Sequence, residues 1–231
     1  MNLLAAFLAS AAVFLAASAS AQQPAAGTYV REGGSGTLQV REGGAFTLES
    51  LGANGHTCTL DGTVLRGRAA TAEGCAVRFE RKAGAIQVAP EGKSDAARDA
   101  CRAHCGMRAH FEGDYFPQPA ACRNASVAAE RAAFLVDYKA KRFQPAATRL
   151  QKLLDACGRL LWWMTDAEVR NDLALAQHRA GDGAACLATL KPLEPLLRGD
   201  QHFPPLEKDW ADGVLPQIRF NRKLCEATPR R

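Results

Sequence analysis

The sequence has little of what most hydrolases and metalloproteins use for their chemistry. Beyond residue 21 there are only four serines, Ser35, Ser50, Ser94 and Ser126, and none lies in a GxSxG motif. This argues against a serine hydrolase, because that motif places the nucleophile on the sharp turn it needs. No two of the eight cysteines are spaced as CxxC, and their intervals are irregular, which argues against a zinc site. We expect no cofactor.

The first 21 residues lack charged side chains and have the pattern of a signal peptide. An apolar run covers residues 3–17 and is followed by Ala19-Ser20-Ala21, a small-x-small cleavage pattern. We predict a signal peptide over residues 1–21 and a periplasmic or secreted mature chain that starts at Gln22. The alternative, an uncleaved anchor, would need a longer run, since a span takes roughly 20 residues. No transmembrane segment is expected in the mature chain.

An even number of cysteines in an exported chain predicts four disulfides. We expect Cys58 to pair with Cys75, because both begin neighbouring predicted strands. We expect Cys105 to pair with Cys122, which would hold the last strand of the first half close to the start of the second half.

The remaining cysteines leave alternatives open. Cys225, near the end of the chain, is expected to bond to Cys157 or Cys186. Cys101 then either bonds to the second half of the chain or acts, beside His104, as a thiol nucleophile.

The net charge of +5 is confined to the second half of the chain. Residues 22–122 hold 11 basic and 11 acidic side chains, whereas residues 123–231 hold 18 and 13. Part of the excess lies near the end, at Arg219, Arg222, Lys223, Arg230 and Arg231. We interpret this as a solvated end, because an exported protein does not meet nucleic acid and the aromatic residues of a single-strand binder are missing.

The first half of the mature chain alternates apolar and polar residues. The pentapeptide VREGG occurs at Val30–Gly34 and again at Val40–Gly44, and each Gly-Gly pair predicts a turn after a strand. Alternation with a period of two marks strands at Leu38, Val40, Phe46, Leu48, Cys58, Leu60, Val64, Cys75, Val77, Phe79, Ile86 and Val88. We predict an antiparallel β barrel or meander over residues 22–122, because closure hides the strand edges.

The last strand of this half is predicted over residues 107–115. Its inward face would consist of Met107, Ala109, Phe111 and Tyr115, and its outward face of Arg108, His110, Glu112 and Asp114. The outward row is interpreted as a solvated charge ladder that could contact a partner. The alternatives are a metal site or an acid and base pair for glycan cleavage, using His110, Glu112 and Asp114.

The second half, residues 123–231, has helical periodicity. We predict helices over residues 127–142, from Pro145 through an apolar stripe to Leu161, from a capping box at Thr165–Glu168 to Gly181, and from about residue 184 to Pro192. A final helix is expected within residues 199–231. The chain is therefore predicted to have an α+β fold, with an N-terminal β barrel or meander followed by a C-terminal helical domain.

Two helical segments, AKRFQPAATRLQKLL and RAGDGAACLATLKPL, align with a period of 40. The matched pairs are Phe143 with Gly183, Ala146 with Cys186, Leu150 with Leu190 and Leu153 with Leu193. This pattern resembles the second helix of a tetratricopeptide repeat, and the segment with Leu173 and Ala174 is similar to its first helix. The period is longer than the usual 34, and the Trp-Leu-Gly start is missing. The resemblance implies stacked helical hairpins that present a surface to a protein.

Trp162 and Trp163 are adjacent at the end of the second predicted helix, so they cannot both face the same core. One of them is expected either where the two halves meet or on a surface that contacts a partner.

The first half resembles small periplasmic barrels that inhibit lysozyme, in its size, its meander and its paired cysteines. That resemblance implies a cell-wall hydrolase as partner, blocked by a loop such as Gly52–His56, which makes Asn54 and His56 candidate contact residues. Our first hypothesis is therefore a non-catalytic, exported protein-binding module whose partner is a protein of the cell envelope. The alternatives are an architectural envelope protein that docks a larger complex and a wall-active or metal-dependent hydrolase.

Overall fold

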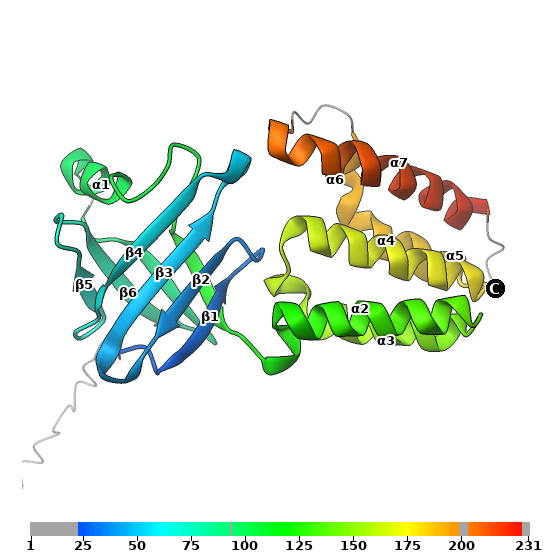
Figure 1. Ribbon diagram of the computed structural model, residues 1–231, viewed down its shortest axis with the longest axis horizontal. Helices are drawn as coiled ribbons and strands as arrows, with labels where there is room; N and C mark the ends of the chain where they lie inside the picture. The colour runs from blue at the N-terminus through cyan, green and yellow to red at the C-terminus, as the bar shows by residue number, and fades with distance from the viewer. Residues whose placement is uncertain (1–22, 93, 199–202, 228–231) are drawn as a thin grey trace, which may run out of the picture.

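The protein has an α+β fold in which a β barrel precedes a set of helices, as predicted (Figure 1). The computed structural model describes residues 23–92, 94–198 and 203–227. The predicted signal peptide, residues 1–21, lies outside the described residues. None of the described helices combines the length and the apolar character needed to cross a membrane.

Eight antiparallel strands form one sheet that nearly closes on itself. They are β1 Gly27–Arg31, β2 Gly36–Val40, β3 Ala45–Leu51, β4 Thr57–Thr63, β5 Arg68–Ala70, β6 Ala76–Lys82, β7 Ala85–Pro90 and β8 Gly113–Pro117. Their order is β4-β3-β2-β1-β8-β7-β6-β5, so the first and last strands pair in the middle of the sheet. Inward side chains such as Leu38, Leu48, Leu60 and Val88 fill the core and are almost fully buried.

Both VREGG copies form turns, as predicted, but they place their side chains on opposite faces. Tyr29 pairs with Leu38 and faces the core, so Val30 faces outward and Arg31 faces into the barrel. In the second copy Val40 faces the core and Arg41 is exposed. A shift of one residue inverts every side chain of a strand, and the two copies differ by such a shift.

The gap in the barrel, between β4 and β5, is covered by helix α1 Asp95–Arg102 and the residues that follow it. The carbonyl of His104 accepts a hydrogen bond from the Thr59 amide at 3.2 Å, and the Gly106 amide donates to the carbonyl of Thr57 at 2.9 Å. These bonds extend β4 with a short added segment. The exposed edge of β4 is therefore paired without a direct β4–β5 ladder.

Two disulfides fix this covering segment to β4 on one side of the gap and to the β5–β6 turn on the other. Cys105 bonds to Cys58 at the start of β4, and Cys101 bonds to Cys75 just before β6. The predicted pairs Cys58 with Cys75 and Cys105 with Cys122 are wrong. The reason is that β4 and β6 are not neighbours in the sheet. The cysteines at their starts bond instead to the covering segment, which uses Cys105 and leaves Cys122 to pair with Cys157.

The predicted strand over residues 107–115 is wrong for its first half, since β8 begins only at Gly113. Residues 107–112 instead cross the end of the barrel next to the helices. The carbonyl of His110 accepts hydrogen bonds from the guanidinium of Arg31 and from Ser50 Oγ, the latter at 2.8 Å. These bonds to the barrel interior replace the missing strand pairing. Met107, predicted to face inward, is 93% exposed.

The helical region contains α2 Asn124–Lys139, α3 Phe143–Cys157, α4 Trp163–Arg179, α5 Gly183–Leu190, α6 Glu194–Leu197 and α7 Pro205–Ala227. The predicted helices are all present, with ends shifted by a few residues. The capping box at Thr165–Glu168 is wrong, because α4 begins at Trp163 and Glu168 bonds to other helices. Helices α2, α4 and α7 lie in one layer, with α3 and α5 behind them (Figure 1).

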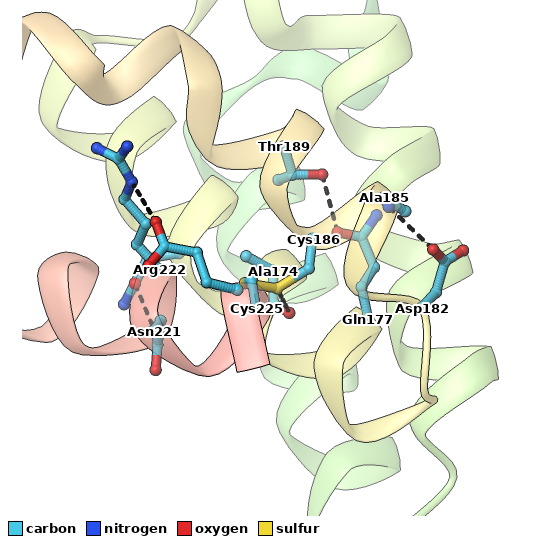
Figure 2. The surroundings of a disulfide bond; sticks show 11 residues. Ala174, Gln177, Asp182, Ala185, Cys186, Thr189, Asn221, Arg222 and Cys225 are labelled. Carbon is cyan, nitrogen blue, oxygen red and sulfur yellow. Dashed lines mark hydrogen bonds and ion pairs between the residues drawn. A yellow bond between two sulfur atoms is a disulfide. The ribbon is translucent and has the colours of Figure 1, made fainter. Parts of the chain in front are cut away.

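Two further disulfides lie in the helical region. Cys122 bonds to Cys157 at the end of α3, and Cys186 of α5 bonds to Cys225 of α7, one of the two predicted alternatives. Figure 2 shows the second bond beside two buried polar contacts. Thr189 Oγ1 donates to Gln177 Oε1 at 2.8 Å, and Asn221 Nδ2 donates to Asn171 Oδ1 at 2.9 Å. Four disulfides indicate an oxidising compartment.

Peptide mapping under non-reducing conditions will test this arrangement. We expect linked peptides for Cys58 with Cys105 and for Cys75 with Cys101, and no peptide that links either pair to Cys122. Replacing both Cys58 and Cys105 by Ser should lower the free energy of unfolding by about 2–4 kcal/mol, because a 47-residue separation is no longer closed. A Cys58–Cys75 peptide would contradict the described covering of the gap.

Candidate functional site

The barrel and the helices meet where the β1–β2 turn approaches the start of α4. The Gly33 amide donates a hydrogen bond to the carbonyl of Arg159 at 2.8 Å. A Cβ atom on Gly34 would lie 2.2 Å from the amide nitrogen of Trp162, closer than real Cβ atoms come to such an atom. The guanidinium of Arg159 lies 4.5 Å from the centre of the Phe116 ring, in the geometry of a cation–π contact. The close approach therefore requires glycine at position 34.

A second contact joins the β3–β4 turn to α7. The amide of Asn54 donates to Glu207 Oε1 at 3.3 Å, and the Leu206 side chain lies against Gly55. Gly52, in the same turn, approaches the backbone of Arg108 and Ala109. The loop that was expected to reach a hydrolase is therefore packed against α7 and the 107–112 segment.

Between the two regions lies a cleft of about 450 Å³, which we call the interdomain cleft. Its lining residues are Val30, Gly34, Thr37, Gln118, Cys122, Asn124, Val127, Ala128, Arg131, Leu160, Leu161, Trp162 and Thr165. Val30 and Thr37 are paired on the outer face of β1 and β2. The outward orientation of Val30, set by the register of β1, thus supplies part of the wall. A cleft of this size is within the range of small-ligand and peptide side-chain sites.

Trp162 lines this cleft and belongs to a cluster that contains all three tryptophans of the sequence. Trp163 packs edge-on against Trp210 of α7, with ring centres 4.8 Å apart, and stacks on Phe203 at 6.0 Å. The ring of Trp162 lies 6.1 Å from that of Trp163. All four side chains are half-buried. Trp162 lies where the two regions meet, one of the two expected positions.

A row of polar side chains, which we call the polar strip, links α2, α4 and α7. Arg131 of α2 forms ion pairs with Glu168 at 2.7 Å and with Asp172 at 3.5 Å, both on α4. The indole Nε1 of Trp210 donates to the other oxygen of Glu168 at 2.8 Å. Each charged member is about one third exposed. The strip therefore carries two carboxylates for one guanidinium and begins in the interdomain cleft, which Arg131 lines.

The pKa of Asp172 is raised above its usual value. Burial is the main cause, and the Glu168 charge adds to it, while Arg131 opposes both. The ionised carboxylate of Asp172 is therefore held less favourably in the folded protein than in the unfolded chain.

The predicted outward row is divided in the structure. Arg108, His110 and Glu112 are exposed and lie in the 107–112 segment, whereas Asp114 is half-buried on β8. No group of three or more His, Cys, Asp or Glu side chains within the described residues could hold a metal ion. The row therefore does not form the predicted ladder on one strand.

Neither expected role of Cys101 is found, because it is bonded to Cys75 within the barrel. The neighbouring His104 uses Nε2 in a hydrogen bond with Thr71 Oγ1 at 3.0 Å. No cysteine of the described residues is free. His56 is half-buried beside Gly106, and its ring lies where a Cβ on that glycine would be.

Sequence reasoning missed Arg131, Glu168, Asp172 and Trp210. The only signal for Trp210 was the rarity of tryptophan, since the chain has three. Because tryptophans often cluster at contact surfaces, Trp210 could have been considered together with Trp162 and Trp163. No family model, curated protein or solved structure matches this chain.

Replacing Gly34 by Ala should separate the barrel from the helices, because the new Cβ meets backbone atoms that cannot move aside. We expect a red shift of tryptophan fluorescence and a larger radius of gyration in X-ray scattering. The matched control is Gly33→Ala, which has the same positive φ but open space around the Cβ. It should cost roughly 1 kcal/mol and leave both signals unchanged. Equal effects of the two variants would argue against the contact.

Replacing Asp172 by Asn should leave the free energy of unfolding at pH 7 unchanged or increase it. The folded state holds the Asp172 proton more tightly than the unfolded chain does, so stability is lost as the pH rises through the raised pKa. The difference from the unmodified protein should shrink below about pH 4, where the carboxyl is protonated in both states.

The control for this experiment is Glu168→Gln, which weakens the ion pair with Arg131. We expect this variant to lower the free energy of unfolding at pH 7 by roughly 1 kcal/mol. Denaturant unfolding at pH 3 and pH 7 measures both variants. A clear loss of stability at pH 7 in Asp172→Asn would show that the ionised carboxylate is favoured.

Proposed function

We propose that this chain is an exported, non-catalytic protein-binding module that takes a segment of an envelope protein into the interdomain cleft. The observation that carries the proposal is a half-buried cluster of all three tryptophans, one of which, Trp162, lines a cleft between the two regions. Tryptophan and arginine are the residue types that contribute most to protein interfaces, and here both line or adjoin one site.

The mixed chemistry of the cleft suits a peptide segment, which offers apolar side chains together with backbone hydrogen-bonding groups. Its lining combines apolar side chains such as those of Val30, Val127 and Leu161 with the polar side chains of Thr37, Gln118, Asn124, Arg131 and Thr165. The polar strip continues from Arg131 across α4 towards α7, so an occupant longer than the cleft would meet hydrogen-bonding groups beyond it. The excess of carboxylates in the strip favours a segment that carries a Lys or Arg side chain.

We further propose that the helical region is a short, tetratricopeptide-like array. Helices α2 and α3 form one antiparallel hairpin, and α4 and α5 form a second with an offset of about 40 residues. Helix α7 packs against α4 and α5 and is covalently held by the Cys186–Cys225 bond, as a third unit or a cap would be. In such an array the first helices of each unit line the binding face, and these would be α2, α4 and α7.

The enzymatic alternative has less support. The thiol candidate Cys101 is disulfide-bonded, and His110, Glu112 and Asp114 do not form a metal-binding group within the described chain. An inhibitor of lysozyme-type enzymes would have to use a loop other than the β3–β4 turn, which α7 occupies. Slowed lysis by a lysozyme-type enzyme in a turbidity assay would restore that alternative.

Site-specific photo-crosslinking tests the proposal. A benzophenone side chain at position 128, which lines the cleft, should form an adduct with a discrete envelope protein. The matched control places the same group at Ala129, which is exposed on the next position of α2 but does not line the cleft. This control should form no adduct. Trp162→Ala should remove the adduct, and Glu168→Gln should weaken it, because this change reduces the excess of carboxylates that favours a basic segment. Identical adducts from positions 128 and 129 would overturn the proposal.

A further inference from the structure

A second cleft lies on the barrel, between α1 and the 107–112 segment, and we call it the α1 cleft. It has a volume of about 320 Å³. Its lining residues are Pro90, Arg98, Cys101, Arg102, Cys105, Met107, Arg108, Ala109, His110, Phe111 and Glu112. Three arginines and a histidine thus line this cleft, whose lining includes a single acidic residue, Glu112.

The arginines of the α1 cleft are only partly neutralised. Arg98 pairs with Asp95 at 2.6 Å, and Arg102 pairs with Asp99 at 3.5 Å. In each pair both residues belong to α1, lie three positions apart and are exposed. Exposed pairs of this kind are weak, so both guanidinium groups remain available to a ligand. Arg108 forms no ion pair with any described residue. Three cations at one opening attract anions, and guanidinium groups bind oxyanions in a planar, two-pronged geometry.

A buried cation is hydrogen-bonded to the segment that lines this cleft. Arg31 is only 8% exposed, and its guanidinium donates to the carbonyl of His110 and to Ser35 Oγ. No carboxylate of the described chain forms an ion pair with it. A buried charge that is hydrogen-bonded but not neutralised keeps its field, which is screened less than that of a surface charge. The segment that lines the cleft is thus held by a positive charge.

The lining of the α1 cleft also has apolar members. Pro90, Ala109 and the nearly buried ring of Phe111 contribute to it, together with the exposed side chain of Met107. The volume is sufficient for an acidic group and a short apolar chain, and too small for a folded partner.

We infer that the α1 cleft binds a small amphiphilic anion, whose carboxylate or phosphate meets Arg98, Arg102 and Arg108 and whose apolar part lies against Phe111 and Met107. This site is separate from the interdomain cleft and does not depend on the function proposed for it. The anionic group could belong to a free molecule or to a lipid headgroup, since both present the same chemistry to the arginines.

Titration calorimetry of the full chain with octyl phosphate and inorganic phosphate, at moderate and high salt, tests the inference. We expect saturable binding of octyl phosphate that weakens with salt, and weaker binding of inorganic phosphate. Arg108→Gln should reduce the affinity for octyl phosphate by about tenfold. The matched control, Arg78→Gln, removes an exposed arginine of β6 outside the cleft and should have no effect.

The outcomes separate clearly. Absence of saturable binding, or equal losses in Arg108→Gln and Arg78→Gln, would overturn the inference, as would inorganic phosphate binding as tightly as octyl phosphate. Sedimentation with phosphatidylglycerol vesicles then distinguishes the sources. Vesicle binding that Arg108→Gln abolishes identifies a lipid headgroup, whereas octyl phosphate binding without vesicle binding identifies a free molecule. Phosphatidylcholine vesicles serve as the neutral control.

Discussion

The relation between the barrel and the helices depends on one close backbone contact, between Gly34 and the Leu161–Trp162 peptide. A side chain at position 34 would overlap the main chain just before α4, so only glycine lets the β1–β2 turn approach this far. The same turn and the same helix start form opposite walls of the interdomain cleft. The width of the cleft is therefore set by a packing distance between two main chains, and the position of Trp162 follows from it.

None of the four disulfides links the barrel to the helical region. Two of the bonds lie within the barrel and two lie within the helical region, so each region is cross-linked only internally. The expectation that sulfur would lock the two halves to each other was wrong, because Cys122 packs in the helical core and pairs with Cys157. Within the described residues, the relative position of the regions is held by hydrogen bonds, backbone packing and the cation–π contact of Arg159 with Phe116. Such non-covalent contacts between regions generally permit relative motion.

The sequence was sufficient for the general fold because alternation in the first half and helical spacing in the second are local signals. It was insufficient for the disulfide pairs, which depend on the order of strands in the sheet and on α1 covering the gap beside β4. The sequence was also insufficient for the residues around the interdomain cleft, because they too come together only in the folded chain. Trp210 reaches Trp163 from a distant helix, and the partners of Arg131 lie on another helix, so no short pattern contains the site. The 107–112 segment alternates like a strand, yet the hydrogen bonds from Arg31 and Ser50 hold it across the barrel end.

The two VREGG copies show how tertiary position decides what a motif does. The second copy makes an ordinary turn in which Arg41 is exposed. In the first copy the register turns Arg31 inward, where it bonds to Ser35 of its own turn and to the His110 carbonyl. The end of β1 and the turn that follows it thus contact Trp162 through Gly34 and hold the lining of the α1 cleft through Arg31. A displacement of this turn would move Trp162 at one cleft and the 107–112 segment at the other. The two proposed sites, whose proposed ligands differ, are therefore positioned by the same short stretch of chain.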